Sequence, residues 1–185
     1  GDDFDQQNFD FYYNYLSGVK EMKPRWKRVL ASANSSLGQL LGKEYVKVAF
    51  SEENKKKVDA MVDNLVQVLE GRIKNLDWMG EETKKQALKK LSTITRKMGY
   101  PDEWKDYSEL MIKEGNGYAE NMMAFSDWNL NKSLSDLGQK VDKTEWKMPP
   151  QLVNASFNPL NNEITFPAAI LQPPFYNYTA DEAVN

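Results

Sequence analysis

The sequence predicts a mainly α-helical protein with a small β-hairpin near its C-terminal end. Over most of residues 1–147, apolar residues recur at three- and four-residue steps, as they do on one face of a helix. All 24 Lys and Arg residues lie at or before Lys147. The segment after it is rich in proline, asparagine and aromatic residues. We therefore predict a helical domain over residues 1–147 and a separate segment over residues 148–185.

Composition limits the functions that the chain can have. Its 185 residues are 41% hydrophobic and 28% charged, which is typical of a globular protein. A net charge of −3 indicates no basic surface of the kind that binds nucleic acids. No apolar run approaches the roughly 20 residues that a membrane helix needs. We expect no nucleic-acid partner and no membrane segment in this chain.

Histidine and cysteine are both absent from the sequence. Without them the chain cannot form a Ser-His-Asp triad, a Cys-His pair or the usual nitrogen and sulfur ligand set of zinc. We predict no catalytic residue and no metal ligand in this chain.

Four helices and a shorter helical segment are expected before Lys147. The aromatic run from Phe9 to Leu16 predicts a short helix. Its rings can grip a ligand, but core packing or a contact with another domain is the favoured interpretation. Pro24 can begin the next helix, which continues to Phe50. Gly38 and Gly42 lie beside its apolar face, where they would allow another helix to approach closely.

The remaining helices have recognisable ends. Ser51 is a suitable N-cap for a helix that reaches Leu76. A third helix is expected to begin near Glu81 and to end at Gly99, because its apolar residues up to Met98 share one side. A further helix is predicted over residues 118–138.

The final segment predicts a hairpin. Residues 152–158 and 164–166 have strand character, and Asn158-Pro159 between them favours a type I turn. Such a hairpin either caps a core or offers its edge to an extended peptide, with the Asn154 amide beside it. The pattern alone favours the capping role.

Three motifs in this segment carry a family resemblance. They are Val-Asn-Ala-Ser-Phe-Asn-Pro at residues 153–159, Asn-Glu-Ile-Thr-Phe-Pro-Ala at 162–168 and Ile-Leu-Gln-Pro-Pro-Phe at 170–175. Together they resemble the segment that precedes the zinc-binding helix in the neprilysin and endothelin-converting-enzyme family of zinc metallopeptidases. Shorter matches at residues 24–26, 99–102 and 145–148 extend the resemblance over nearly the whole chain.

The resemblance implies a role for four residues. Asn154 and Ala155 would belong to an edge strand that binds the backbone of a peptide substrate. Ile170 and Phe175 would line the pocket for the apolar residue that follows the scissile bond. The hairpin would then be the start of a zincin-like catalytic domain, incomplete in this chain.

The resemblance also implies what the chain would not do alone. The zinc ligands of the family lie on a helix with the motif His-Glu-x-x-His, which the sequence does not contain. We expect zinc in the intact parent enzyme and none bound by this chain, which would be inactive alone and would have the remainder of the catalytic domain as a partner. The cysteines and membrane anchor of vertebrate members are missing, which favours a bacterial-type member. An extracytoplasmic location follows from the resemblance only.

Two other functions stay open from the sequence. The chain can be a noncatalytic module that binds peptides or a protein partner without cutting them. It can also be a scaffold half that associates with a separately produced catalytic half.

Overall fold

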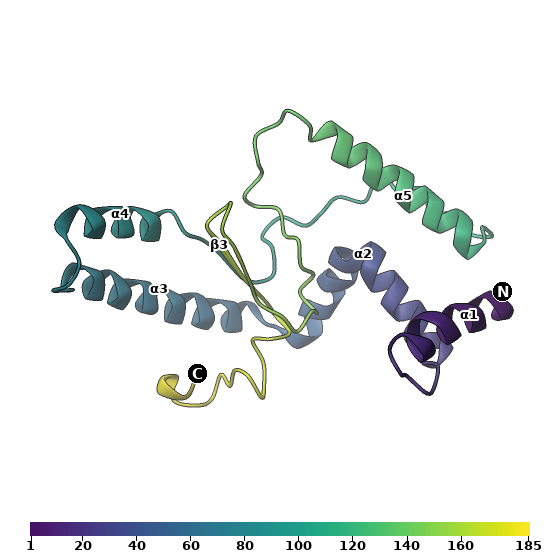
Figure 1. Cartoon of the computed structure of the whole chain (residues 1–185), viewed down its shortest axis with the longest axis horizontal. Coiled ribbons are helices and arrows are strands. Elements are labelled where there is room, and N and C mark those ends of the chain that lie inside the picture. The colour runs from purple at the N-terminus through teal and green to yellow at the C-terminus, as the bar shows by residue number, and fades with distance from the viewer. The chain divides into compact units, whose positions relative to one another are not determined.

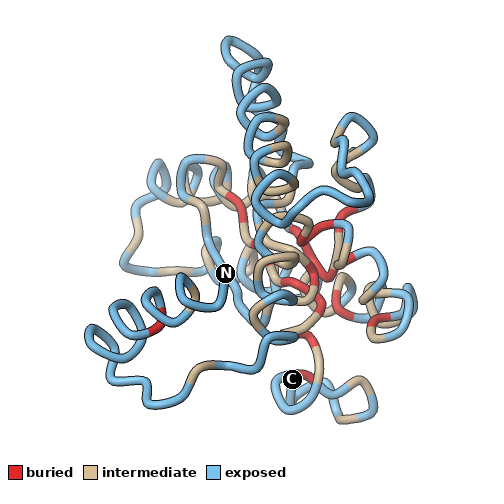
Figure 2. Tube along the Cα trace, turned by 90° about the vertical axis from the view of Figure 1, so that its right-hand side faces the viewer, coloured by how far each residue is buried: buried red, intermediate tan, exposed pale blue.

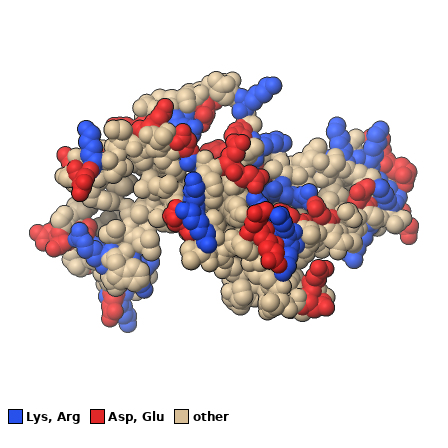
Figure 3. All heavy atoms as spheres, turned by 180° about the vertical axis from the view of Figure 1, so that it is seen from behind, with Lys and Arg blue, Asp and Glu red and all other residues tan.

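The computed structural model describes all residues from Gly1 to Asn185 and confirms the predicted class, mainly α with a small sheet (Figure 1). The chain forms two compact units, Gly1–Leu37 and Gly38–Asn185. None of its helices combines the length and the apolar composition that crossing a membrane requires. On the face that Figure 3 shows, acidic and basic side chains are interspersed.

The first unit is built from α1 (Asp2–Asn8), the π-helix η1 (Phe9–Tyr15) and the beginning of α2 (Arg25–Ala49). The predicted short helix is therefore confirmed, but core packing holds for Phe9 alone. The other rings of the run are more than half exposed in this chain: Phe11, Tyr12, Tyr13 and Tyr15. An ion pair joins Arg28 Nη1 to Asp5 Oδ2 at 2.7 Å. The unit ends at Leu37, where α2 leaves helical geometry.

The second unit contains most of the fold. Its elements are the remainder of α2, α3 (Glu52–Lys74), α4 (Glu81–Ser92), β1 (Thr95–Gly99), α5 (Tyr118–Ser135), β2 (Ser156–Asn158), β3 (Glu163–Pro167) and the 3-10 helix η2 (Glu182–Val184). Ser51 caps α3 as predicted, because its side chain accepts a hydrogen bond from the Asn54 backbone N–H at 3.2 Å. The predicted helix over residues 118–138 corresponds to α5.

The third predicted helix is wrong beyond Ser92. The helix ends there, and residues Thr95–Gly99 form a strand parallel to β3. Two physical reasons account for the change. The run Thr-Ile-Thr that follows Ser92 is β-branched and favours a strand, and pairing with β3 satisfies its backbone groups.

The sheet has the order β1-β3-β2, so β3 is the central strand. β1 pairs with β3 in parallel, and β2 pairs with β3 in antiparallel fashion to form the predicted hairpin. Asn158 stabilises the turn of this hairpin, because its Oδ1 accepts from the Leu160 N–H at 3.0 Å.

One face of the sheet lies toward α3, beside a buried core. Figure 2 shows in red which stretches of the chain are buried. The core joins α2, α3, β1 and the segment after β3, and its buried members are Phe50, Val58, Met98, Ala168, Leu171 and Tyr176. Gly99 ends β1 with φ +78°, and a Cβ there would lie 2.7 Å from the Phe50 ring. Glycine is therefore required where β1 meets the core.

Gly38 and Gly42 are contacted by a different partner from the one predicted. We expected another helix, and the structure has the Pro149-Pro150 segment in that place. A Cβ on Gly42 would lie 2.5 Å from Pro150 Cδ. Gln151 Nε2 completes the contact by donating to the Gly38 carbonyl at 2.9 Å. Rigid proline rings need the space that a missing side chain leaves.

This contact bears on how the chain is divided. The predicted boundary between residues 147 and 148 falls inside the second compact unit, in which Pro149 and Pro150 are fixed on α2. The boundary between a helical and a catalytic domain stays a prediction.

We predict that Gly42→Ala lowers the free energy of unfolding by about 1–3 kcal/mol, because the added methyl group overlaps Pro150. Gly71→Ala is the matched control, since it also lies in a helix but has no atom within 4 Å of an added Cβ. The control should be neutral or stabilise by about 0.5–1 kcal/mol. Urea unfolding measures both, and equal effects of the two substitutions would contradict the packing argument.

Candidate functional site

Asn154 and Ala155 lie immediately before β2, not within it. The strand was expected from residue 152, but it begins at Ser156. In the register of the hairpin, continued pairing would place Asn154 opposite Pro167, which has no N–H to donate. The ladder therefore stops early, and that part of the prediction is wrong.

Both residues are exposed. Asn154 Oδ1 accepts a hydrogen bond from the Ala155 N–H at 2.8 Å, so this amide already has a partner within the chain. The carboxamide nitrogen of Asn154 has no hydrogen-bond partner in the structure. An extended ligand can accept from that nitrogen, or donate to the second lone pair of Asn154 Oδ1, which the Ala155 N–H leaves free.

β2 is an edge strand, because it pairs only with β3. One side of its backbone is therefore without a neighbouring strand in this chain. Edges of this kind accept extended peptides by main-chain hydrogen bonding. Asn154 and Ala155 continue the chain from the N-terminal end of this edge.

Ile170 and Phe175 lie in a loop that follows β3, and we call residues 168–178 the proline loop. It contains the cis peptide bond Pro173–Pro174. Leu171 and Tyr176 are buried and anchor the loop in the core. Ile170 is half-buried, whereas Phe175 is 62% exposed.

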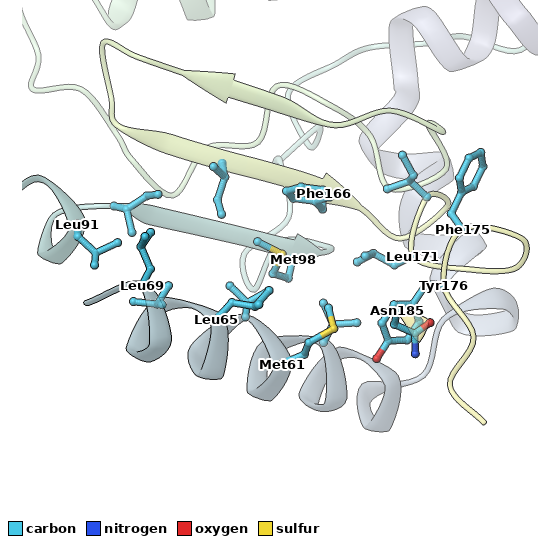
Figure 4. A pocket seen from close by; sticks show the side chains of 16 residues that line it. Met61, Leu65, Leu69, Leu91, Met98, Phe166, Leu171, Phe175, Tyr176 and Asn185 are labelled. Carbon is cyan, nitrogen blue, oxygen red and sulfur yellow. The ribbon is translucent and has the colours of Figure 1, made fainter. Parts of the chain in front are cut away.

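Both Ile170 and Phe175 line an open apolar groove of about 490 Å³. The groove runs between α3 and the apolar face of the sheet, and reaches the proline loop. Its lining is Val58, Met61, Val62, Leu65, Val66, Leu69, Leu91, Ile94, Met98, Ile164, Phe166, Ile170, Leu171, Phe175, Tyr176 and Asn185. Figure 4 shows Met61, Leu65 and Leu69 directed from α3 toward the sheet, and Phe175 at one end with its ring turned away from α3.

The structure therefore brings two of the four predicted residues together. Ile170 and Phe175 share the groove, while Asn154 and Ala155 do not line it and lie at the edge of the sheet. The small sheet thus has two different exposed surfaces: the polar backbone edge of β2 and the apolar groove. Their assignment to a substrate stays a prediction.

Sequence reasoning missed the contribution of α3 to this groove. The sequence indicated a helix here with a stripe of apolar residues at helical spacing, but no groove was predicted from them. Leu65 is 58% exposed, and Leu69 is 47% exposed, so the stripe is not fully covered within this chain. Periodicity identifies an apolar face, but it does not say what covers that face.

The opposite face of the sheet is polar and buried. Lys97 Nζ lies 2.7 Å from Glu163 Oε2, and both side chains are less than a tenth exposed. Lys97 also donates to the Glu145 carbonyl at 2.6 Å, and the Thr165 hydroxyl donates to Glu163 at 3.4 Å. This network ties β1, β3 and the segment before Pro149 together. Each charge is paired, as burial requires.

The residues of this chain do not fit a zinc site. They include no His or Cys, and no three Asp or Glu side chains are grouped so as to hold a metal ion. No reaction step is therefore assigned to a metal held here.

Comparison with known proteins gives consistent matches. Family models described as peptidase family M13 match residues 1–101 and residues 154–185. The neutral endopeptidase of Lactococcus lactis subsp. cremoris is 35% identical over 175 residues, covering 94% of this chain and 28% of the relative. The endothelin-converting enzyme homolog of Locusta migratoria is 35% identical, covering 92% of this chain and 24% of the relative.

Solved structures agree in fold. A zinc metalloprotease of Mycobacterium tuberculosis in complex with an inhibitor is 41% identical with a TM-score of 0.85, over 98% of this chain and 27% of that one. PepO from Lactobacillus rhamnosis is 34% identical with a TM-score of 0.86, over 93% of this chain and 28% of that one. The chain thus spans about a quarter of the length of the proteins that it matches.

We predict that Lys97→Met lowers the free energy of unfolding by about 3–5 kcal/mol, because it leaves the Glu163 carboxylate buried without its partner. The double variant Lys97→Met with Glu163→Leu should recover part of this loss, since neither charge then remains. Lys56→Met, which removes an exposed partner of Glu52, is the control and should have little effect. Chemical denaturation would refute the prediction if the Lys97 and Lys56 variants lost equal stability.

Proposed function

This chain belongs to peptidase family M13, and from that premise we propose that it forms part of a neprilysin-like zinc metalloendopeptidase. The proposed enzyme hydrolyses small peptides on the amino side of apolar residues. In it, this chain supplies a helical wall of the substrate chamber and the substrate-binding edge strand. The zinc site is contributed by residues outside the chain.

The observation that carries the proposal is the position of Ile170 and Phe175 on one apolar groove, beside a sheet with a free edge. Transfer of an apolar side chain from water to such a surface is favourable by about 25 cal/mol for each Å² buried. Aliphatic and aromatic walls therefore suit an apolar residue after the scissile bond. The core packing of Leu171 and Tyr176 holds these walls in place.

The edge of β2 has a separate task in the proposal. The backbone of an extended peptide aligns beside residues 154–158, and the Asn154 carboxamide adds a donor and an acceptor to the main-chain groups. This edge fixes the direction and register of the substrate. The apolar walls then select its side chain.

Residues outside this chain would hold the zinc of the intact enzyme, and that zinc would supply polarisation of the scissile carbonyl and activation of water. The remainder of the catalytic domain is therefore the chain's essential partner, and peptides are its substrates. We also propose an extracytoplasmic location, which cell fractionation with an antibody to this chain would test.

We predict that the 185-residue chain alone neither hydrolyses peptides nor retains zinc, whereas the full protein encoded by its gene does both. Peptide hydrolysis followed by mass spectrometry and metal analysis of both proteins provide the measurement. Stoichiometric zinc in the isolated chain, or a full protein that binds peptides without cutting them, would contradict the proposal. The second result would support a noncatalytic binding module instead.

In the full protein, Asn154→Ala should lower kcat/KM by an amount equivalent to about 1–3 kcal/mol, because one or two hydrogen bonds to the substrate backbone are lost. Asn129→Ala is the matched control, since Asn129 is also an exposed asparagine but lies on α5. Steady-state kinetics on one peptide measures both variants. Unchanged kinetics in a folded Asn154 variant would remove this residue from the site.

A further inference from the structure

We propose that Tyr45, Gln172 and Tyr178 are positioning residues that fix the proline loop and thereby set the width of the apolar pocket between Ile170 and Phe175. The inference rests on the proposed function, because it concerns the same pocket. None of the three is a catalytic residue. They act on substrate selection through the backbone of the loop.

Gln172 makes hydrogen bonds with both its side chain and its backbone. Its side-chain Nε2 donates to the Tyr45 hydroxyl at 2.7 Å and to the Ala168 carbonyl at 3.1 Å. Since a carbonyl can only accept, the second bond fixes which end of the amide is nitrogen. Its backbone carbonyl accepts from the N–H groups of Phe175 at 2.9 Å and Tyr176 at 3.0 Å. One residue thus links helix α2, the start of the loop and the backbone of a proposed wall residue.

Tyr178 holds the same loop from its other end. Its hydroxyl donates to the Leu171 carbonyl, next to Gln172. The Tyr178 ring packs edge-on against Tyr176 at 4.7 Å and Phe50 at 6.1 Å between ring centroids. Burial raises the pKa of the Tyr178 hydroxyl, so it remains protonated and able to donate.

The positions of Ile170 and Phe175 depend on these contacts, because the packing of their own side chains is incomplete. Leu171 and Tyr176 are buried in the core, whereas Phe175 is 62% exposed and Ile170 is only half-buried. The position of the Phe175 ring therefore follows from the backbone to which it is attached. Tyr45 does not line the groove, so its hydroxyl does not contact a residue bound there. It influences such a residue through its hydrogen bond to Gln172 in the loop.

The test uses the full protein and two peptides that differ only in having Leu or Ala after the scissile bond. Tyr45→Phe removes one hydroxyl, and Gln172→Met removes the amide while keeping the length of the side chain. In each variant, kcat/KM for the Leu peptide should fall about 2–10-fold, through KM more than kcat, with a smaller fall for the Ala peptide. The Leu-to-Ala selectivity ratio therefore decreases.

Tyr15→Phe is the matched control, because it removes a hydroxyl from a tyrosine that is 79% exposed and far from the loop in sequence. It should leave the ratio unchanged. A ratio unchanged in a folded Tyr45→Phe variant overturns the inference and leaves the proposed function intact. A wild-type protein that cuts neither peptide overturns the proposed function itself.

Hydrogen exchange gives a readout that does not depend on activity. The Phe175 and Tyr176 amides bond to the Gln172 carbonyl, so their exchange should accelerate about 2–10-fold in Tyr45→Phe. Protection equal to wild type would show that the Tyr45 hydroxyl does not fix the loop, and would overturn the inference even if Gln172→Met fails to fold.

Discussion

The pairing of β1 with the central strand β3 is the constraint on which the rest of the second unit depends. It brings together two segments that are distant in the sequence. Lys97 and Glu163, 66 residues apart, stabilise the pairing with a buried ion pair. An unpaired partner would carry a large desolvation penalty, so this register is strongly favoured over its alternatives. Once β3 is fixed, its position determines where the hairpin edge and the proline loop lie.

The two faces of β3 then have different consequences. The face with Glu163 and Thr165 is closed by polar contacts that reach the Glu145 carbonyl. The face with Ile164 and Phe166 is apolar and remains partly open above α3. In the proposed enzyme, this asymmetry separates a rigid support from a binding surface. In the same proposal, the edge of β2 adds the backbone hydrogen bonds that the apolar surface cannot supply.

Local signals in the sequence predicted the helices that have clear ends. Ser51 marked the beginning of α3, whereas the change of composition after Lys147 comes later than the end of the last α-helix at Ser135. β1 was missed because Leu91, Ile94 and Met98 have helical spacing, while the strand that pairs with them comes much later in the sequence. A pattern within one segment cannot report a partner that is distant in the chain.

Part of the candidate site was also predictable from the sequence. The motif resemblance singled out Ile170 and Phe175, and the structure places both on one groove. The resemblance could not show that pairing with β3 begins only at Ser156, which leaves Ala155 outside the strand. This limit follows from the position of Pro167 in the register. The link between Tyr45 and Gln172 was also invisible, because only folding brings residues 127 positions apart into contact.

In the proposed enzyme, the proline loop forms the wall against which a substrate residue binds. This role is tested most directly by photo-crosslinking the full protein to a peptide with a photoreactive phenylalanine after the scissile bond. Crosslinks are expected within residues 170–175, and they should be competed by the unlabelled peptide and reduced by Phe175→Ala. Crosslinks found only outside the proline loop and the groove would contradict it.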